Sequence, residues 1–359
     1  MSFRIGVDSG GTFTDVCLVD EASGRISVWK LPSTPGDPSI AIAEGAREIL
    51  ERFATGRAAD VSFFGHGTTV ATNALIQGRG ARAGVVTNEG FRDLLELARQ
   101  RRPHLYDLQT DKPPALVPRD RRHEVEARVH FDGRVERAPE PEKVRAVARR
   151  LAEQGVEAVA VCFLYSFLDP SHERLVAEIL AEELGSGAFI TCSHQVSPEF
   201  REYERLSTTV VNAFLGPVMR FYLDNLTPRL REAGIAAPPH ITQSNGGTIS
   251  FETAAAQPVR TILSGPSTGV VGALEIARIA GVRDLITFDM GGTSTDVALI
   301  DGGAPGLTTE AEVHGYPIKV PMIDIQTVGA GRGSIAHIDS GGFLKVGPRS
   351  AGAEPGPVC

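Results

Sequence analysis

The sequence contains little cysteine, and its four cysteines form no closely spaced pair. They are scattered along the 359 residues at Cys17, Cys162, Cys192 and Cys359. A disulfide framework or a cysteine-built zinc site is therefore not expected. The chain also lacks an apolar run of about 18 residues, the length that a membrane-spanning helix needs. We therefore predict no membrane partner.

Two other absences narrow the functional class. The first residues show no charged leader followed by an apolar segment, so we expect no secretory signal and a cytoplasmic protein. Basic residues are outnumbered, because 36 Lys and Arg against 44 Asp and Glu give a net charge of -8. This balance argues against a nucleic-acid partner. The basic run at residues 99–102 is more typical of a solvated helix end.

What the sequence does contain is an internal repeat. Residues 5–20 read IGVDSGGTFTDVCLVD and residues 286–301 read ITFDMGGTSTDVALID, with ten of sixteen positions identical without gaps. Each copy is an apolar strand, a Gly-Gly turn and a second apolar strand, which is typical of a β-hairpin. The copies lie 281 residues apart, too far for a solenoid. We therefore predict two related half-domains that each begin with this hairpin.

The Gly-Gly turn of each copy has the composition of a phosphate site. Adjacent glycines permit positive φ and leave backbone N–H groups open to an anion, while the threonine hydroxyls add donors. The aspartate that ends the first strand can hold a hydrated Mg²⁺. One such turn is more often a plain hairpin, but two copies favour a clamp on a nucleotide. The predicted metal and catalytic residues are Asp8 and Asp289, and the predicted phosphate ligands are Gly10, Gly11, Thr12, Thr14, Gly291, Gly292, Thr293, Ser294 and Thr295.

Two more glycine-containing segments are candidates for anion binding. Residues 263–269 precede a helix expected from residue 269, and here Gly265 can border an anion site or a serine can form an ordinary N-cap. Residues 327–334 form a turn with Gly329 and Gly331 that resembles a dinucleotide fingerprint only loosely. We count these three glycines as candidate nucleotide ligands.

Three polar residues have open roles. His66, in the Gly-His-Gly-Thr-Thr segment between a strand and a helix, is a candidate for catalytic proton transfer, although it can equally bond a loop carbonyl. Asp15 and Asp296 close the two repeat motifs, and each can either join the site or cap its own turn.

The remainder of the chain alternates strands and helices, which predicts an α/β architecture. Residues 103–122 contain several prolines and predict a long loop. Residues 340–359 are rich in Gly and Pro and suggest no closing element. Expected helices are 39–53, 69–77, 91–99, 142–154, 171–184 with its charges outside, and 199–226, the last as one long helix or two, interrupted near Gly216-Pro217.

Several blocks, in order along the chain, resemble the hydantoinase A and 5-oxoprolinase family. They are IGVDSGGTFTD at the start, GHGTTVATNAL at 65–75, ARAGVVTNEGFRDLLELARQ at 81–100, STTVVNAFLGP at 207–217, QSNGG at 243–247, FDMGGTSTDVALI at 288–300, IDIQTVGAGRGSIA at 323–336 and VGPRSAGAEPGPVC at 346–359. The resemblance covers essentially the whole chain. It implies an actin, hexokinase and Hsp70-like (ribonuclease H-like) ATPase fold that uses ATP and Mg²⁺.

The resemblance also implies a reaction. Family members use ATP to open a cyclic amide such as hydantoin, 5-oxoproline or a lactam, through phosphoryl activation of the amide oxygen. They work with a hydantoinase B-type subunit, which this chain lacks, so we expect an oligomer. Two departures leave the substrate open: Ser267-Thr268 stands where the family usually has Ala-Gly, and Arg332 where it has Gly. Arg332 can reach a phosphate or a substrate carboxylate, or point to solvent.

The resemblance further implies two domains, an N-terminal hydantoinase/oxoprolinase domain at 1–187 and the first part of a hydantoinase A domain at 188–359. Family members are about twice as long, so we expect a fragment, incomplete at its C-terminus and weak or inactive alone. One alternative is a subunit of an ATP-dependent ketone carboxylase of the acetone or acetophenone type. Another is a non-catalytic actin-like nucleotide-binding module.

Overall fold

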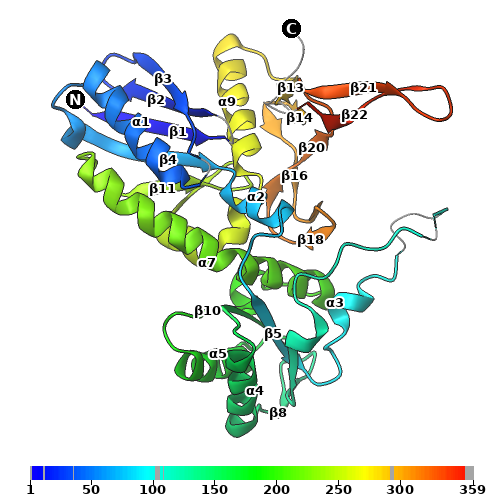
Figure 1. Cartoon of the computed structure of the whole chain (residues 1–359). Helices are drawn as coiled ribbons and strands as arrows, with labels where there is room; N and C mark the ends of the chain where they lie inside the picture. The colour runs from blue at the N-terminus through cyan, green and yellow to red at the C-terminus, as the bar shows by residue number, and fades with distance from the viewer. Residues whose placement is uncertain are drawn as a thin grey trace. The chain divides into compact units, whose positions relative to one another are not determined.

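A computed structural model describes residues 2–10, 13–34, 36–101, 106–107, 109–291 and 295–351. Contacts between residues divide the chain into two compact units. The first unit comprises Met1–Ile241, Thr248–Ile262 and Thr309–Val320, and the second comprises Thr242–Gly247, Leu263–Thr308 and Pro321–Cys359. The expected boundary near residue 188 stays a prediction. Figure 1 shows the chain with its helices and strands labelled.

A six-stranded sheet carries the first repeat copy. Strands β1 and β2 form the expected antiparallel hairpin, and β1 also pairs with β4 in parallel. Side chains of β1 alternate between buried and exposed, which is the signature of a half-buried strand. The strand order is β12 (Thr248–Ser250), β11 (Pro239–Thr242), β4 (Val61–Thr68), β1 (Phe3–Ser9), β2 (Phe13–Asp20) and β3 (Ile26–Pro32).

Helix α1 (Pro38–Phe53) covers the apolar face of this sheet. It begins where Asp37 accepts a hydrogen bond from the backbone N–H of Ser39, and Pro38 occupies the first helical position. Its Gly45 lies where a Cβ atom would overlap Val16 and Leu31. The helix therefore packs closely on β2 and β3. The expected helix at 39–53 is confirmed.

A second sheet in the same unit is fully parallel, in the order β10 (Phe189–Cys192), β9 (Ala158–Cys162), β5 (Ala83–Asn88) and β6 (Arg122–Val125). Helices α4 (Pro141–Glu153) and α5 (Ser171–Leu184) contribute to the core on one face. Helix α7 (Glu202–Glu232) packs on the other face through Leu206, Val210 and Ala213. Parallel sheets need cover on both faces, and β9 is accordingly buried at every position.

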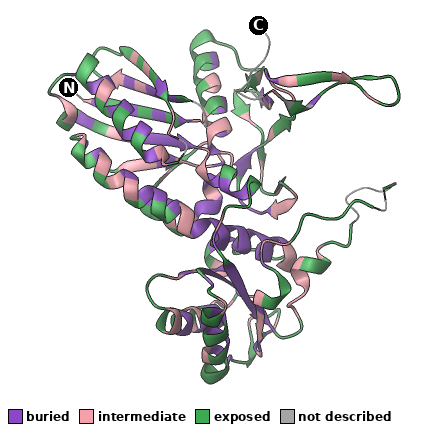
Figure 2. Cartoon of the chain, in the orientation of Figure 1, coloured by how far each residue is buried: buried purple, intermediate pink, exposed green. Residues whose placement is uncertain are grey.

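Of the two alternatives for residues 199–226, one long helix or two, the structure has the single helix α7, without a break at Gly216-Pro217. It contains Pro217 and Pro228 in its interior. A proline removes one backbone hydrogen bond, but α7 is buried throughout from Glu204 to Gly216, in the half of the helix that precedes the proline, where Figure 2 shows a purple stretch. Packing against α1, α2 (Val70–Ile76) and β9 holds the helix together across the proline.

Other expectations need smaller corrections. The helix expected at 91–99 shortens to α3 (Leu94–Leu97), because Ala98 and Gln100 adopt positive φ, which ends a helix. Of the loop expected at 103–122, the described part includes η2 (Arg119–Arg121). The remaining short elements of this unit are η1 (Ala58–Asp60), β7 (Arg128–Val129), β8 (Val135–Arg137), α6 (Ser193–Val196), α8 (Phe251–Ala256), η3 (Pro258–Thr261), β17 (Ala311–Val313) and β18 (Tyr316–Ile318).

The second unit contains the second repeat copy in an antiparallel sheet. Strand β14 (Thr295–Asp301) pairs with β13 (Leu285–Met290), β15 (Ala304–Pro305) and β20 (Ile325–Val328). Helix α9 (Ser264–Ala280) packs on one face of this sheet. Its start was expected at residue 269, but the segment from Ser264 already forms its first turns.

The C-terminal part of the second unit also has more structure than its composition indicates. Strand β21 (Ser334–Ile338) pairs with β22 (Leu344–Ser350) in a hairpin, although no closing element was expected there. A further two-stranded ladder joins β16 (Leu307–Thr308) to β19 (Met322–Ile323). Within the described ranges, no helix combines the length and apolar character that a bilayer crossing requires.

Candidate functional site

The two repeat hairpins share one strand register. In the first, Asp8 lies opposite Asp15, and in the second, Asp289 lies opposite Asp296. A shift of 281 residues converts each pair into the other, so the sequence repeat is also a structural repeat. Both Asp8 and Asp289 are exposed at the turn end of their strand, which is where a hydrated cation can reach a carboxylate.

The turn of the first hairpin is held by side chains behind it. Gly11 and Thr12 lie outside the described residues. The N–H of Gly10 donates to the carbonyl of Phe13 at 3.0 Å, and the hydroxyl of Ser33 donates to the carbonyl of Gly10 at 2.7 Å. Thr14 is fully buried, with its Oγ1 2.9 Å from Ser33 Oγ. Phosphate contacts from Gly10 and Thr14 stay predictions, and both residues already have a hydrogen-bond partner in Ser33.

The turn of the second hairpin is supported by the predicted 327–334 turn. Gly292, Thr293 and Ser294 lie outside the described residues. The carbonyl of Gly291 accepts the N–H of Arg332 at 2.9 Å, and the hydroxyl of Thr295 donates to the carbonyl of Ala330 at 2.5 Å. The N–H of Gly331 donates to Ser334 Oγ at 2.7 Å. The sequence motifs around Gly291 and Gly331 therefore meet in one place.

Helix α9 reaches the same hairpin. A Cβ atom on Gly269 would lie 3.9 Å from Oδ2 of Asp289, so the beginning of this helix approaches the predicted metal ligand. Gly265 lies in the first turn of the helix. Around Asp289, three segments that the sequence singled out come together: the second hairpin, the start of α9 and the 327–334 turn. A nucleotide-binding role for Gly265 and Gly329 stays a prediction.

Asp15 and Asp296 contact the neighbouring strand. Lys30 on β3 pairs with Asp15 at 2.8 Å, and Thr327 on β20 donates to Asp296 at 2.6 Å. Each carboxylate therefore stabilises strand pairing beside its hairpin. The turns that they were expected to cap lie partly outside the described residues.

His66 is buried inside the six-stranded sheet. Its side chain has no exposed surface, and its Nε2 forms a hydrogen bond with the hydroxyl of Tyr222 on α7. Burial lowers the pKa of His66 to about 3, so the ring is neutral at physiological pH. A neutral, enclosed imidazole cannot supply positive charge to a phosphate. Sequence reasoning missed Tyr222, because nothing in the pattern of a long buried helix distinguishes it.

A cavity of about 420 Å³ opens beside the first hairpin. Ser9 and Gly10 at the end of β1 line it, so it adjoins the predicted phosphate turn. The other lining residues come from the β3–α1 connection, α2 and α7, and they are Ser33, Thr34, Gly36, Asp37, Pro38, Thr69, Val70, Asn73, Ala74, Gln77, Arg79, Val218, Phe221 and Tyr222. Its size fits a small-molecule site.

Comparison with known proteins decides the family. A model described as the hydantoinase/oxoprolinase N-terminal region matches residues 4–184, and a model described as hydantoinase/oxoprolinase matches residues 205–359. The chain belongs to the hydantoinase/oxoprolinase family. The resemblance inferred from the sequence blocks is therefore confirmed.

Relatives of this hydantoinase/oxoprolinase chain are longer than it is. Caprolactamase subunit alpha of Pseudomonas jessenii is 40% identical, with 99% of this chain and 52% of the relative covered. A 5-oxoprolinase of Dictyostelium discoideum is 34% identical, with 100% and 31% covered. The chain thus spans about half or less of the length of the curated relatives it matches.

Solved structures share the fold of the hydantoinase/oxoprolinase chain. The ATP-dependent caprolactamase from Pseudomonas jessenii superposes with a TM-score of 0.88 at 39% identity, covering 99% of this chain and 52% of that one. A nucleotide-free acetone carboxylase superposes with a TM-score of 0.84 at 28% identity, covering 98% and 51%. The expected α/β, actin-like ATPase fold is confirmed.

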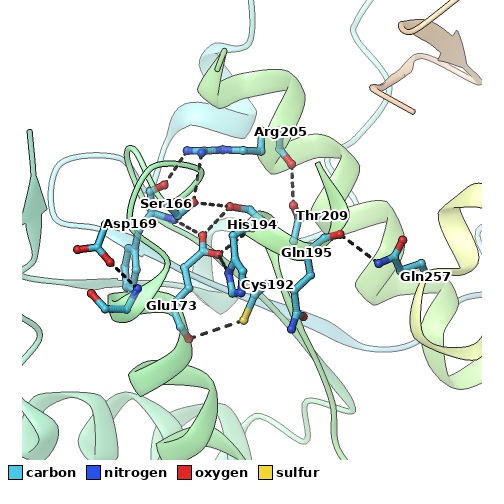
Figure 3. Close-up of polar contacts among 12 residues, drawn as sticks. Ser166, Asp169, Glu173, Cys192, His194, Gln195, Arg205, Thr209 and Gln257 are labelled. Carbon is cyan, nitrogen blue, oxygen red and sulfur yellow. Dashed lines mark hydrogen bonds and ion pairs between the residues drawn. The ribbon is translucent and has the colours of Figure 1, made fainter. Parts of the chain in front are cut away.

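The hydantoinase/oxoprolinase chain also contains a buried polar network that the sequence did not predict (Figure 3). Glu173 was expected on the outer face of its helix, but it is fully buried. It accepts hydrogen bonds from the hydroxyl of Ser193 at 2.5 Å and from the backbone N–H of His194 at 2.9 Å. Ser166 lies 2.9 Å from Ser193 and accepts a hydrogen bond from Arg205, which is also fully buried.

This network has the character of a structural bridge. Burial opposes ionisation of Glu173, but the hydrogen bonds from His194 and Ser193 outweigh it and hold the pKa of Glu173 below its usual value. Glu173, Cys192 and His194 offer potential metal ligands close together. However, the carboxylate of Glu173 already accepts hydrogen bonds from protein donors. Burial also raises the pKa of the Cys192 thiol, which keeps the thiol protonated. The cluster is therefore better described as a hydrogen-bonded network than as a metal site.

Proposed function

We propose that the chain is the ATP-binding part of an enzyme that uses ATP to hydrolyse a cyclic amide, such as hydantoin, 5-oxoproline or a lactam. The observation that supports this most is the pair of hairpins with one register, each with an exposed aspartate beside a Gly-Gly turn. Relatives described as an ATP-dependent caprolactamase and a 5-oxoprolinase support the reaction class.

The proposed chemistry begins with attack of the amide oxygen on the γ-phosphorus of ATP. The bond from phosphorus to the β–γ bridging oxygen breaks, and its electron pair leaves with ADP. Water then adds to the activated carbon and the ring C–N bond breaks, which yields an amine and an acyl phosphate. A second water releases phosphate and the free carboxylate. The protein's task is positioning and charge stabilisation, as in other phosphoryl transfers.

Each of the two exposed aspartates is suited to serve as a carboxylate ligand of a magnesium ion. Mg²⁺ takes one or two carboxylates together with waters and phosphate oxygens, and it does not need a cage of protein ligands. Asp8 and Asp289 would each offer one carboxylate beside a phosphate turn. The ion would neutralise charge on the phosphate oxygens. In the first unit, the turn residues from Gly10 to Thr14 would contact phosphate oxygens. In the second unit, the turn residues from Gly291 to Thr295, with Gly265, Gly329 and Gly331, would do the same.

We infer a positioning role for His66. Its ring is neutral and enclosed, and it bonds the hydroxyl of Tyr222, which lines the cavity beside the first hairpin. The catalytic proton transfer suggested by the sequence would need a protonated form that burial disfavours. His66 therefore fixes Tyr222 at the cavity wall.

A partner subunit is part of this proposal. One relative is described as a subunit alpha, which supports a multi-subunit enzyme. We propose a hydantoinase B-type subunit as the partner and an oligomeric assembly. The cytoplasmic location expected from the sequence stays a prediction, consistent with the use of ATP.

A ketone carboxylase is the second candidate. The acetone carboxylase structure shares the fold at 28% identity, and a relative described as the acetophenone carboxylase gamma subunit is 34% identical over 99% of this chain. The same first step applies, because an enolate oxygen can be phosphorylated like an amide oxygen. The hydrolase is preferred because caprolactamase subunit alpha has the higher identity, 40%.

The decisive experiment measures release of ADP and phosphate by the full-length protein with its partner subunit. Hydantoin, 5-oxoproline, caprolactam, and acetone with bicarbonate serve as substrates. We expect a cyclic amide to stimulate release of ADP and phosphate. If only acetone with bicarbonate stimulated the release, the carboxylase would be favoured. If the protein bound nucleotide but no substrate stimulated phosphate release, the chain would instead be a non-catalytic nucleotide-binding module.

A further inference from the structure

We propose that the 420 Å³ cavity beside the first hairpin binds the cyclic amide, and that Arg79 selects substrates that carry a carboxylate. This inference rests on the proposed function and adds a site and a substrate class to it. The cavity shares Ser9 and Gly10 with the first hairpin, so an acceptor bound there lies next to the turn that would hold the transferred phosphate.

The charge of the cavity identifies the ligand. Among the described lining residues, Arg79 is the one cation and Asp37 the one anion. Asp37 is already engaged, because Arg229 pairs with it at 2.6 Å and it accepts the N–H of Ser39 at 3.1 Å. Arg79 is exposed, in the segment after α2. A guanidinium binds a carboxylate through two parallel hydrogen bonds, so the cavity favours a ligand with one carboxylate.

The neutral lining residues fit the rest of a lactam ring. Asn73 donates from Nδ2 to the hydroxyl of Thr69 at 3.2 Å, so its carbonyl oxygen is the atom that can accept a ring N–H. Val70, Ala74 and Phe221 provide apolar surface for ring methylenes. This combination of an apolar wall with a few polar groups is typical of small-molecule sites. It matches a five-membered lactam acid such as 5-oxoproline.

The test compares two ligands that differ only in the carboxylate. 5-Oxoproline and 2-pyrrolidinone are titrated into the full chain by calorimetry, with and without a non-hydrolysable ATP analogue and Mg²⁺. We expect Arg79→Ala to weaken 5-oxoproline binding about 10- to 100-fold, the loss typical of a charged hydrogen-bonded contact. Binding of 2-pyrrolidinone should not change.

Two further variants sharpen the result. Gln77→Glu adds a negative charge to the cavity wall and should weaken 5-oxoproline binding while sparing 2-pyrrolidinone. Arg82→Ala removes an exposed arginine that does not line the cavity, and it should bind both ligands like the wild type. Circular dichroism checks that each variant is folded.

Three outcomes would overturn the assignment: no binding of either ligand by the wild type, equal binding of 5-oxoproline by the wild type and Arg79→Ala, or an equal loss of both ligands in Arg79→Ala. The proposed function is judged separately, by phosphate release from the full-length protein with its partner. Carboxylate-selective binding without turnover would count against the function and for the site. Turnover with Arg79-independent binding would count against the site alone.

Discussion

At the scale of single residues, the buried carboxylate of Glu173 has the strongest physical consequences. A charge with no exposed surface is stable only when hydrogen bonds replace its water. Ser193, His194 and the N–H of Phe163 supply those bonds, and Arg205 contributes through Ser166. The network joins α5, α6 and α7, so removing one member affects several elements together.

We predict that Glu173→Gln lowers the free energy of unfolding by about 3 kcal/mol or more at pH 7, because it leaves several buried N–H and O–H donors without their charged acceptor. The folded-state pKa of Glu173 lies below its usual value of 4.5. Its contribution is therefore present above that value and disappears as pH falls through the folded-state pKa. Urea titrations at pH 7 and at lower pH should show the difference from wild type shrinking on acidification.

The matched control for this prediction is Glu178→Gln, an exposed position on the same helix. Its free energy of unfolding should stay within about 0.5 kcal/mol of wild type. Equal effects at Glu173 and Glu178 would contradict the buried network.

A second residue-scale prediction concerns the hairpin aspartates. Asp8→Asn and Asp289→Asn should each reduce substrate-stimulated phosphate release by about 100-fold or more, because charge stabilisation of the phosphates is lost. Asp15→Asn and Asp296→Asn, directly across the strand pairs, should retain most activity, since their carboxylates contact β3 and β20. Wild-type turnover in Asp8→Asn or Asp289→Asn would remove the metal role.

Sequence alone located Asp8 and Asp289, because a repeated motif marks equivalent positions without a structure. It could not locate Glu173, whose place in the first turn of a helix is typical of an exposed acid. It also could not show that His66 is enclosed, because burial depends on a distant residue, Tyr222. Long-range contacts of this kind leave no periodic signal.

At the scale of elements, close packing explains where the sequence-based helix boundaries failed. Helix α7 continues through Pro217 because Gly216 allows the ring of Phe189 to lie against the helix backbone. The pattern of helix breakers indicated a stop there, but burial of the preceding three turns outweighs the lost hydrogen bond. The helix expected at 91–99 differs in the opposite sense. The observed helix is shorter than predicted, because the backbone conformation of Ala98 ends it.

We predict opposite effects for two helix glycines. Gly216→Ala should lower the free energy of unfolding by about 1–3 kcal/mol, because the new methyl group would overlap the buried Phe189 ring. Gly272→Ala in α9 meets no atom within 4 Å and should raise it by about 0.5–1 kcal/mol. Thermal or urea unfolding of both variants measures this. A stabilised Gly216→Ala would contradict the packing of α7.

At the scale of the whole molecule, the two repeat hairpins differ in whether a helix covers the same face of the strands. Ile5 and Val7 of the first hairpin are 1% and 4% exposed on the face that α1 covers. Their equivalents in the second hairpin, Ile286 and Phe288, are 68% and 65% exposed. Helix α9 packs on the opposite face of that sheet, against Ala298 and the residues around it. The second unit therefore presents a row of apolar side chains to solvent.

Exposed apolar rows of this kind promote association. We predict that the 359-residue chain binds a hydrophobic dye while folded and self-associates at micromolar concentration, and that Phe288→Ser reduces both. Sedimentation velocity and dye fluorescence measure the change. Val7→Ser is the informative contrast, because it should unfold the first hairpin instead. A monomeric wild type without dye binding would show that the row is covered.

The hydroxyl of Ser33 has a consequence for energetics. It lines the cavity and also holds the carbonyl of Gly10 in the first turn. A ligand that fixes the Ser33 side chain from the cavity side therefore changes the free energy needed to order the turn around a nucleotide. By thermodynamic linkage, the two affinities must change by one common factor. Each ligand would thus report on the presence of the other, without any large movement of the chain.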